Sequence, residues 1–325
     1  MYSLLIAFVA CIPAIAPGPT AAPTAPPTVS TRTTGSPAVA LLAFGSTWDA
    51  PGFEGEAAVL ATAMAASSEG LRIDVARDAT WLTAADGCPA NLDAALRSPD
   101  LSDDAVARAA IQVGQELDSA SSSATWLGAQ ALQMQLFRGL PEAHAPLGRR
   151  GSLPLIDGPR VRDRYRAWVS QATVNVSATP ECAAQVAPAV NDALAHLPPA
   201  VVEPPPPFAA TTPMPAPLHL AAPAPGLWVG WALPPTALPD RLPQPPAPWR
   251  AELHLGVKRP WLGLVRDDDL PDEVLDDELK ALAPWLGELG ASVNAEHSVL
   301  VHLHAEDSLT TGVSPVITTA LEVLR

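Results

Sequence analysis

Basic side chains are scarce in this chain. Of its 325 residues, 19 are Lys or Arg and 34 are Asp or Glu, which gives a formal net charge of -15. No cluster of Lys and Arg interrupts this acidity, so we expect no nucleic acid partner. The sequence also lacks a nucleophile elbow, a phosphate-binding glycine loop and a dinucleotide-binding fingerprint, and no spacing of Ser, His and Asp selects a catalytic triad.

Cysteine is scarce as well, with only Cys11, Cys88 and Cys182. None of them lies in a C-x-x-C spacing, so a zinc ribbon or a thioredoxin-like role has no support. If Cys11 is lipidated or removed during export, Cys88 and Cys182 remain as an even pair. They are then a candidate disulfide in an oxidising compartment.

The chain also lacks an apolar run long enough to span a bilayer. Its first residues, MYSLLIAFVACIPAIAPGPT, contain a shorter run that is typical of an export signal. We therefore expect a signal or lipoprotein-like segment over 1–16 and a tether rich in Pro, Ala and Thr over 17–37. Cleavage before Cys11 with attachment of lipid, cleavage elsewhere by the ordinary signal peptidase, and an uncleaved N-terminus in a cytoplasmic protein all stay open. Export predicts a periplasmic or envelope-anchored protein.

Proline is abundant, with 38 residues, but it is clustered. Because 48% of the chain is hydrophobic and 16% charged, the composition is that of a folded protein. The proline clusters therefore indicate linkers between ordered units, above all over 198–225, where Pro204 to Pro207 are consecutive. This predicts a first unit over 38–197 and a second over 226–325.

The hydrophobic periodicity predicts an α+β pattern in both units. In the first unit we expect strands at 38–44, 71–75, 79–83 and 174–178, and helices at 54–66, 91–96, 102–116, 126–137, around Tyr165, and at 183–196. In the second unit we expect strands at 227–233, 252–255, 261–265, 292–295 and 299–304, and helices at 272–289 and 313–324. Residues 289–308 with the helix after them parallel residues 69–87 with the helix after those, so the second unit reads as an eroded repeat of the first.

The segment from Gly45 to Thr83 resembles the opening of a pitrilysin/insulinase-type zinc peptidase domain. In that family a strand ending in Gly-Ser leads to a Glu-Gly pair, here Glu54-Gly55, and then to a helix with the inverted zinc motif H-x-x-E-H. On this alignment Ala58, Ala61 and Thr62 stand at the three motif positions. Methyl groups offer zinc no lone pair and a threonine hydroxyl is a poor ligand, so the catalytic set is missing.

The resemblance implies a LuxS/mitochondrial-processing-peptidase-like metallohydrolase fold of two related, shortened units. It also places the family's third zinc ligand, a glutamate, at Glu116, and its assisting carboxylate at Ala109. Glu116 is therefore either a relic of metal binding or an ordinary solvated helix residue.

His302 and His304 alternate along an expected strand and so share one face of it. With His297, Glu306 and Asp307 nearby in the sequence, they are the best remaining metal candidates. The other interpretation is a solvent-facing strand whose opposite side, Val299, Val301 and Leu303, packs inward.

These patterns favour an exported, catalytically inactive homologue of this family that needs no cofactor. Some members of the family work as pairs in which only one subunit carries zinc, so the implied partners are a zinc-bearing homologous subunit or extended peptides. Two alternatives remain: a zinc metalloendopeptidase with displaced ligands, using Glu116 with His302 and His304, and a structural envelope lipoprotein.

Overall fold

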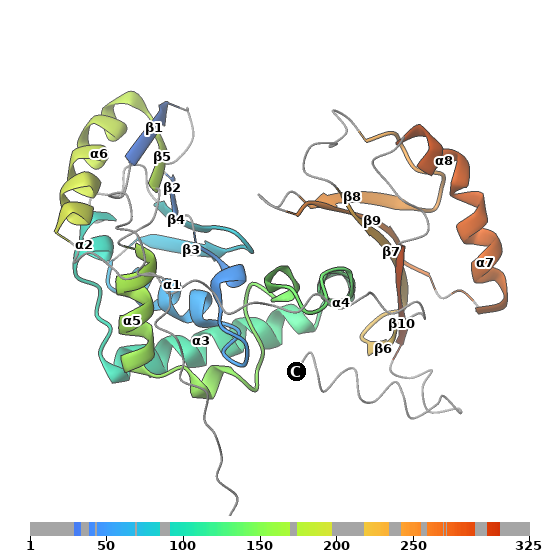
Figure 1. Cartoon of the computed structure of the whole chain (residues 1–325), viewed down its shortest axis with the longest axis horizontal. Coiled ribbons are helices and arrows are strands. Elements are labelled where there is room, and N and C mark those ends of the chain that lie inside the picture. Colours follow the sequence, from blue (N-terminus) through green and yellow to red (C-terminus); the bar gives the residue numbers. More distant parts are fainter. Residues whose placement is uncertain are drawn as a thin grey trace, which may run out of the picture.

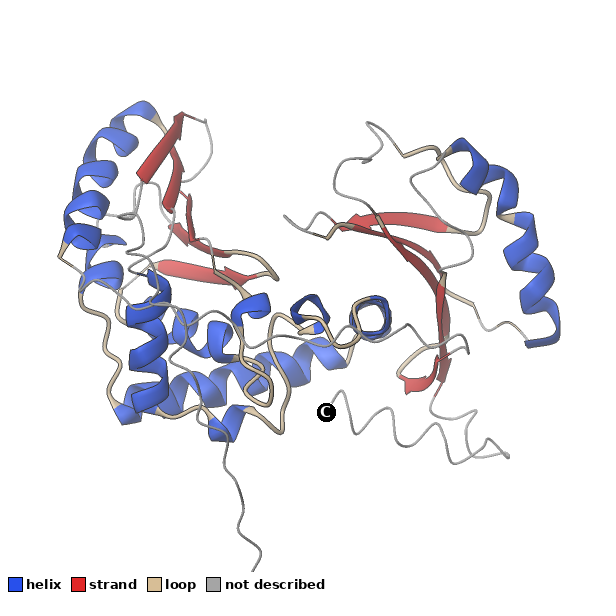
Figure 2. Cartoon of the chain, in the orientation of Figure 1, coloured by secondary structure: helices blue, strands red, loops and turns tan. Residues whose placement is uncertain are grey.

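The computed structural model describes residues 29–33, 39–42, 44–68, 70–84, 92–169, 174–196, 218–233, 242–254, 259–268, 270, 272–289 and 298–305. These residues form a mixed helix and strand structure, which confirms the predicted α+β class (Figure 2). Within them, no helix is both long enough and apolar enough to cross a membrane.

The first sheet has five strands in the order β1-β5-β2-β4-β3 (Figure 1). Its strands are β1 (Val29–Thr33), β2 (Val39–Leu42), β3 (Leu71–Val75), β4 (Thr80–Ala84) and β5 (Val174–Ala178). β1 and β5 pair in parallel, and the remaining neighbours are antiparallel. The tether expected over 17–37 contains β1, since residues Val29 to Thr33 form a strand that pairs with β5.

The second sheet repeats this topology, with the order β6-β10-β7-β9-β8. Its strands are β6 (Leu218–Ala222), β7 (Gly226–Ala232), β8 (Arg250–His254), β9 (Trp261–Arg266) and β10 (Val299–Ala305). Here β6 and β10 form the parallel pair, and the other three pairs are antiparallel. The second unit is thus a topological repeat of the first.

The alignment that the sequence suggested for this repeat was wrong. It matched β10 with β4, whereas the pairing places β10 in the position of β5 and the hairpin β8-β9 in the position of β3-β4. The expected linker over 198–225 was also too long, since β6 occupies 218–222 as an edge strand beside β10. The expected strand at 292–295 and the expected helix at 313–324 lie outside the described residues.

The described residues of the first unit include six helices. They are α1 (Glu56–Ala66), α2 (Leu92–Arg97), α3 (Asp103–Ser121), α4 (Ala124–Leu136), α5 (Gly158–Val169) and α6 (Pro180–Ala195). Three short 3₁₀ helices, η1 (Ser46–Trp48), η2 (Pro141–Ala143) and η3 (Leu153–Leu155), shape the loops around them.

The helix boundaries follow from capping side chains. The Ser102 hydroxyl accepts a hydrogen bond from Ala105 N at 3.3 Å and starts α3, whose first turn carries Asp103 and Asp104. Ser123 caps α4 in the same way, and Thr179 caps α6 ahead of a proline at its first position. The expected single helix over 272–289 is divided into α7 (Asp272–Ala281) and α8 (Ala283–Glu288), with Pro284 in the first turn of α8.

Helix α4 joins the two units. It packs on β7 and β10 of the second sheet, while α7 and α8 cover the opposite face of that sheet (Figure 1). Leu132 of α4 fits against Gly230 and Gly263, which are register partners on β7 and β9. Around this contact Leu127, Leu136 and Phe137 meet Trp228 and Trp261 in one apolar cluster.

Polar contacts add to this junction. Arg77, in the turn between β3 and β4, donates a hydrogen bond to the carbonyl oxygen of Arg259 at 3.2 Å. The Arg259 guanidinium in turn pairs with Glu142 at 3.2 Å. The second sheet is therefore anchored to the first unit by an apolar helix face and by a short polar bridge.

Candidate functional site

The positions that the resemblance assigns to the zinc motif lie in the core of the first unit. Ala58 is 1% exposed, Ala61 is 0% and Thr62 is 8%. α1 is buried along nearly its whole length, from Glu56 to Met64, and packs against α3 and β3. The small side chains at these positions serve close packing against the rest of the first unit.

The start of α1 is held by a buried carboxylate. Asp49 is 2% exposed and accepts hydrogen bonds from the backbone N–H groups of Gly55 at 2.6 Å and Ala57 at 2.8 Å. Burial raises the pKa of the Asp49 carboxyl well above its usual value, although these two donors act in the opposite direction. Gly55 itself has a φ of 111°, a left-handed conformation that favours glycine.

A second acidic group fixes α1 to α5. Glu56 is 0% exposed, and its carboxylate pairs with Arg160 and Arg164 of α5. The Arg160 guanidinium also lies over the Phe53 ring, 3.4 Å from its centroid. Asp49 and Glu56, beside the first turn of α1, are thus engaged in backbone hydrogen bonds and in ion pairs.

Glu116 belongs to α3, the helix that packs against α1. It lies on the exposed side of α3, where it accepts a hydrogen bond from Gln112 Nε2 at 2.9 Å. Ala109, at the position of the assisting carboxylate, is 4% exposed and faces the core. The Glu116 side chain thus faces solvent, whereas Ala58 and Ala61 lie in the core.

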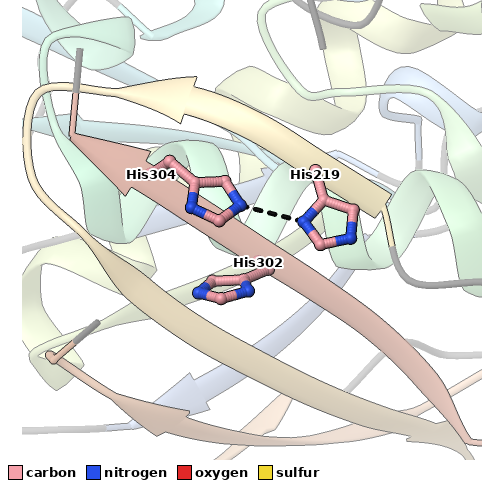
Figure 3. Close-up of side chains that lie close together, drawn as sticks. All are labelled: His219, His302 and His304. Atoms are coloured by element: carbon pink, nitrogen blue, oxygen red, sulfur yellow. Dashed lines mark hydrogen bonds between the residues drawn. The ribbon is translucent and has the colours of Figure 1, made fainter. Parts of the chain in front are cut away.

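The histidines of the second unit do form a cluster. His302 and His304 lie on β10 together with His219 on β6, and one ligand nitrogen from each lies within 4.8 Å of the others (Figure 3). His219 Nδ1 and His304 Nε2 share a hydrogen bond at 2.9 Å. His302 is 1% exposed, and the other two are half-buried. The expectation of a solvent-facing strand was wrong for His302, although Val299, Val301 and Leu303 pack inward as predicted.

Sequence reasoning missed His219 because it lies in the segment taken for a linker. The alternation Leu218-His219-Leu220 matches Val301-His302-Leu303, and this pattern was the available signal for a second histidine-bearing strand. The neighbours named from the sequence, His297, Glu306 and Asp307, lie outside the described residues. Glu116 is not part of the cluster, so the displaced-ligand set of Glu116, His302 and His304 is not assembled in the described residues.

The cysteines are only partly described. Cys182 is disulfide-bonded and 7% exposed near the start of α6. Cys88 and Cys11 both lie outside the described residues, so the pairing of Cys88 with Cys182 and the lipidation of Cys11 stay predictions.

A groove of about 750 Å³ opens between α3 and the segment 153–159. Its charged residues pair with one another or with neighbours: Arg150 with Asp118, and Asp103 with Arg162. The residues that line this groove do not place a general acid, a general base and a nucleophile within reach of one another.

No family model matches the chain, and no curated protein matches its sequence. Solved structures do match its fold. The inactive domain of a peptidase M16 from Pseudomonas fluorescens is 14% identical, with a TM-score of 0.55 over 85% of this chain and 94% of that one. The first half of the periplasmic protease PqqL from Escherichia coli is 11% identical, with a TM-score of 0.55 over 91% of this chain and 93% of that one.

Two longer proteins match over part of their length. Against whole PqqL the chain covers 48% of the protease at a TM-score of 0.53 and 13% identity. Pitrilysin is 14% identical, with a TM-score of 0.54 over 79% of this chain and 34% of that one. At these identities the likeness establishes the architecture. The chain has the fold of pitrilysin-type peptidase M16 domains, which confirms the fold predicted from the sequence resemblance.

Proposed function

We propose that this chain is a catalytically inactive peptidase homologue that acts as the non-catalytic partner of a zinc-bearing subunit. The observation that carries the proposal is the packing of α1: Ala58 and Ala61, where ligand and base would stand, are at most 1% exposed. The space that zinc ligands would need around these positions is filled by packed side chains. A protein that keeps this fold without its reaction is suited to binding.

The expected partner is a homologous subunit that supplies the half of the protease that this chain does not cover. Because the chain covers 48% of whole PqqL, it offers about half of the structure that forms that protease. A homologous subunit with an intact H-x-x-E-H helix would supply the other half and the metal. This chain would then complete the chamber around the substrate.

Extended peptides are the second expected ligand class. Among the strands that the structure describes, β3 and β8 each stand at the end of a sheet beside a single strand, so each can pair with an added strand. Along β3 the exposure alternates between half-buried and exposed residues, with Arg72 and Asp74 exposed. Such an edge can hold peptide backbone by main-chain hydrogen bonds with little sequence preference.

We place this activity outside the cytoplasm. The apolar segment over 1–16, the pair Cys88 and Cys182 and the candidate lipid site at Cys11 support export, with a soluble periplasmic or lipid-anchored form as its two variants. The likeness to the periplasmic protease PqqL agrees with this location.

Reconstitution tests the proposal. The chain is mixed with a zinc-bearing family member encoded by the same genome, and mass and peptide hydrolysis are measured together. We expect a one-to-one complex that cleaves peptides faster than the zinc subunit alone. The proposal fails if the chain stays monomeric and leaves the rate of every zinc-bearing homologue unchanged.

A further inference from the structure

The strand register gathers three imidazoles on one face of the second sheet. β6 and β10 run parallel with His219 opposite His302, so the two side chains project from the same face. His304 lies two residues after His302 and shares that face as well. Figure 3 shows the three rings side by side across the two strands.

We propose that His219, His302 and His304 bind a divalent transition-metal ion, with Zn²⁺ as the best match. Neutral imidazole nitrogens suit Zn²⁺, Cu²⁺ and Ni²⁺, whereas Mg²⁺ and Ca²⁺ require oxygen ligands. Three histidines are a sufficient protein ligand set for zinc when water takes the fourth position.

The distances are close to those that coordination requires. With Zn–N bonds of about 2.0–2.1 Å and tetrahedral angles, two ligand nitrogens lie about 3.3 Å apart. His219 Nδ1 and His304 Nε2 are 2.9 Å apart and share one proton. An ion that replaces this proton needs the two nitrogens to separate by only a few tenths of an ångström. His302 has its ligand nitrogen within 4.8 Å of the others, so this nitrogen must move closer to complete the set.

The surroundings strengthen the site. On this face His302 is the register partner of Leu227, which is 0% exposed and belongs to the apolar cluster under α7 and α8. The hydrogen-bonded strands β6 and β10 hold the three imidazoles in place, and the burial of His302 keeps competing water away from its side of the site.

The ion would join β6, an edge strand, to β10 beside it. It would fix the start of the second unit to the sheet that α4 anchors. This site is separate from the motif positions of α1 and does not depend on the proposed function. A structural ion here is compatible with an inactive subunit.

The test uses the full chain without a histidine tag, first dialysed against a chelator. Zn²⁺ is then titrated by calorimetry, and Co²⁺ is followed by its visible absorption. We expect one equivalent of Zn²⁺ per chain, a tetrahedral Co²⁺ spectrum and a higher Tm with Zn²⁺. His219→Gln and His304→Gln should each raise the Kd by more than the roughly 10- to 100-fold that loss of a supporting residue costs.

His196→Gln is the matched control, because the His196 side chain is 64% exposed at the end of α6. It should leave the Kd unchanged. His302→Gln is the second variant, with circular dichroism to verify folding, since His302 is buried. The proposal is overturned if the native chain takes up no Zn²⁺, or if uptake survives His219→Gln and His304→Gln. Chelator-sensitive peptide hydrolysis would overturn the proposed function instead. The histidine site would still be tested by the number of Zn²⁺ ions bound per chain.

Discussion

At the scale of single residues, the motif positions of α1 show how a metal site and a packed core exclude each other. Ala58 and Ala61 are at most 1% exposed, and α3, α5 and β3 all contact the helix that carries them. Zinc ligands need room for imidazole rings and a bound water. In this chain that room is filled, so a histidine in place of Ala58 would add volume to a closed core.

Ala58→His should therefore destabilise the protein by about 2–5 kcal/mol, because it overpacks the core and buries an imidazole. Urea unfolding followed by tryptophan fluorescence measures the change. Ala66→His is the control, since Ala66 ends the same helix on its exposed side and should cost no more than about 0.5 kcal/mol. Equal stability of the two variants would mean that space for a ligand persists beside α1.

Tyr165 gives a second residue-level prediction. Its hydroxyl donates a 2.5 Å hydrogen bond to the Leu96 carbonyl, and burial raises its pKa to about 12. Because the folded pKa lies above the unfolded value of about 10, Tyr165 stays protonated to a higher pH in the folded chain than in the unfolded chain. The stabilisation that comes from the protonated Tyr165 phenol is complete below the unfolded pKa. As the pH rises from the unfolded pKa to the folded pKa, this stabilisation is lost and the free energy of unfolding falls.

Only two tyrosines are present, Tyr2 and Tyr165, so absorbance at alkaline pH isolates the group in a Tyr2→Phe background. We expect a phenol midpoint of about 12 in the folded protein. Tyr165→Phe should abolish this signal and cost about 1 kcal/mol through the lost hydrogen bond. A midpoint at the ordinary tyrosine value in the folded protein would show that Tyr165 is not buried as described.

At the scale of elements, α4 decides how the two units are joined. Gly128 lies against the second sheet, and a Cβ added there would come within 2.0 Å of Trp228 Nε1. Trp228 is 1% exposed and cannot yield easily. The helix face is therefore shaped for backbone contact with the sheet.

Gly128→Ala should destabilise the protein by about 1–3 kcal/mol, although alanine is the better helix former. Gly114→Ala is the matched control, because a Cβ at Gly114 in α3 meets only Leu153, at an ordinary 3.7 Å. That change should be neutral or stabilising by up to about 1 kcal/mol. If both variants gain stability in chemical unfolding, α4 does not pack closely on the second sheet.

The same elements show what sequence could and could not predict. Local signals placed β3 at its observed bounds and most of the other predicted elements within a few residues of theirs. This works because hydrophobic periodicity and helix-capping residues depend on side chains that are close in the sequence. Strand pairing depends on contacts distant in sequence, so the repeat was aligned on the wrong hairpin. Proline clusters concealed β6, and with it His219, the residue that completes the histidine cluster.

At the scale of the whole molecule, the chain combines a repeated topology with an unequal use of its two units. In the first unit, the positions of α1 that the sequence resemblance assigns to the zinc motif hold small, buried side chains. The second keeps the five-strand order and gains a histidine cluster on the face away from α4. Both features support the proposed binding role.

The most direct test of this account is peptide hydrolysis by the isolated chain. The purified protein is supplied with Zn²⁺ and a mixed set of quenched fluorescent peptides, with and without a chelator. We predict no cleavage above the buffer rate in either condition, because α1 offers neither ligands nor a base. Cleavage that the chelator abolishes and Zn²⁺ restores would contradict the account.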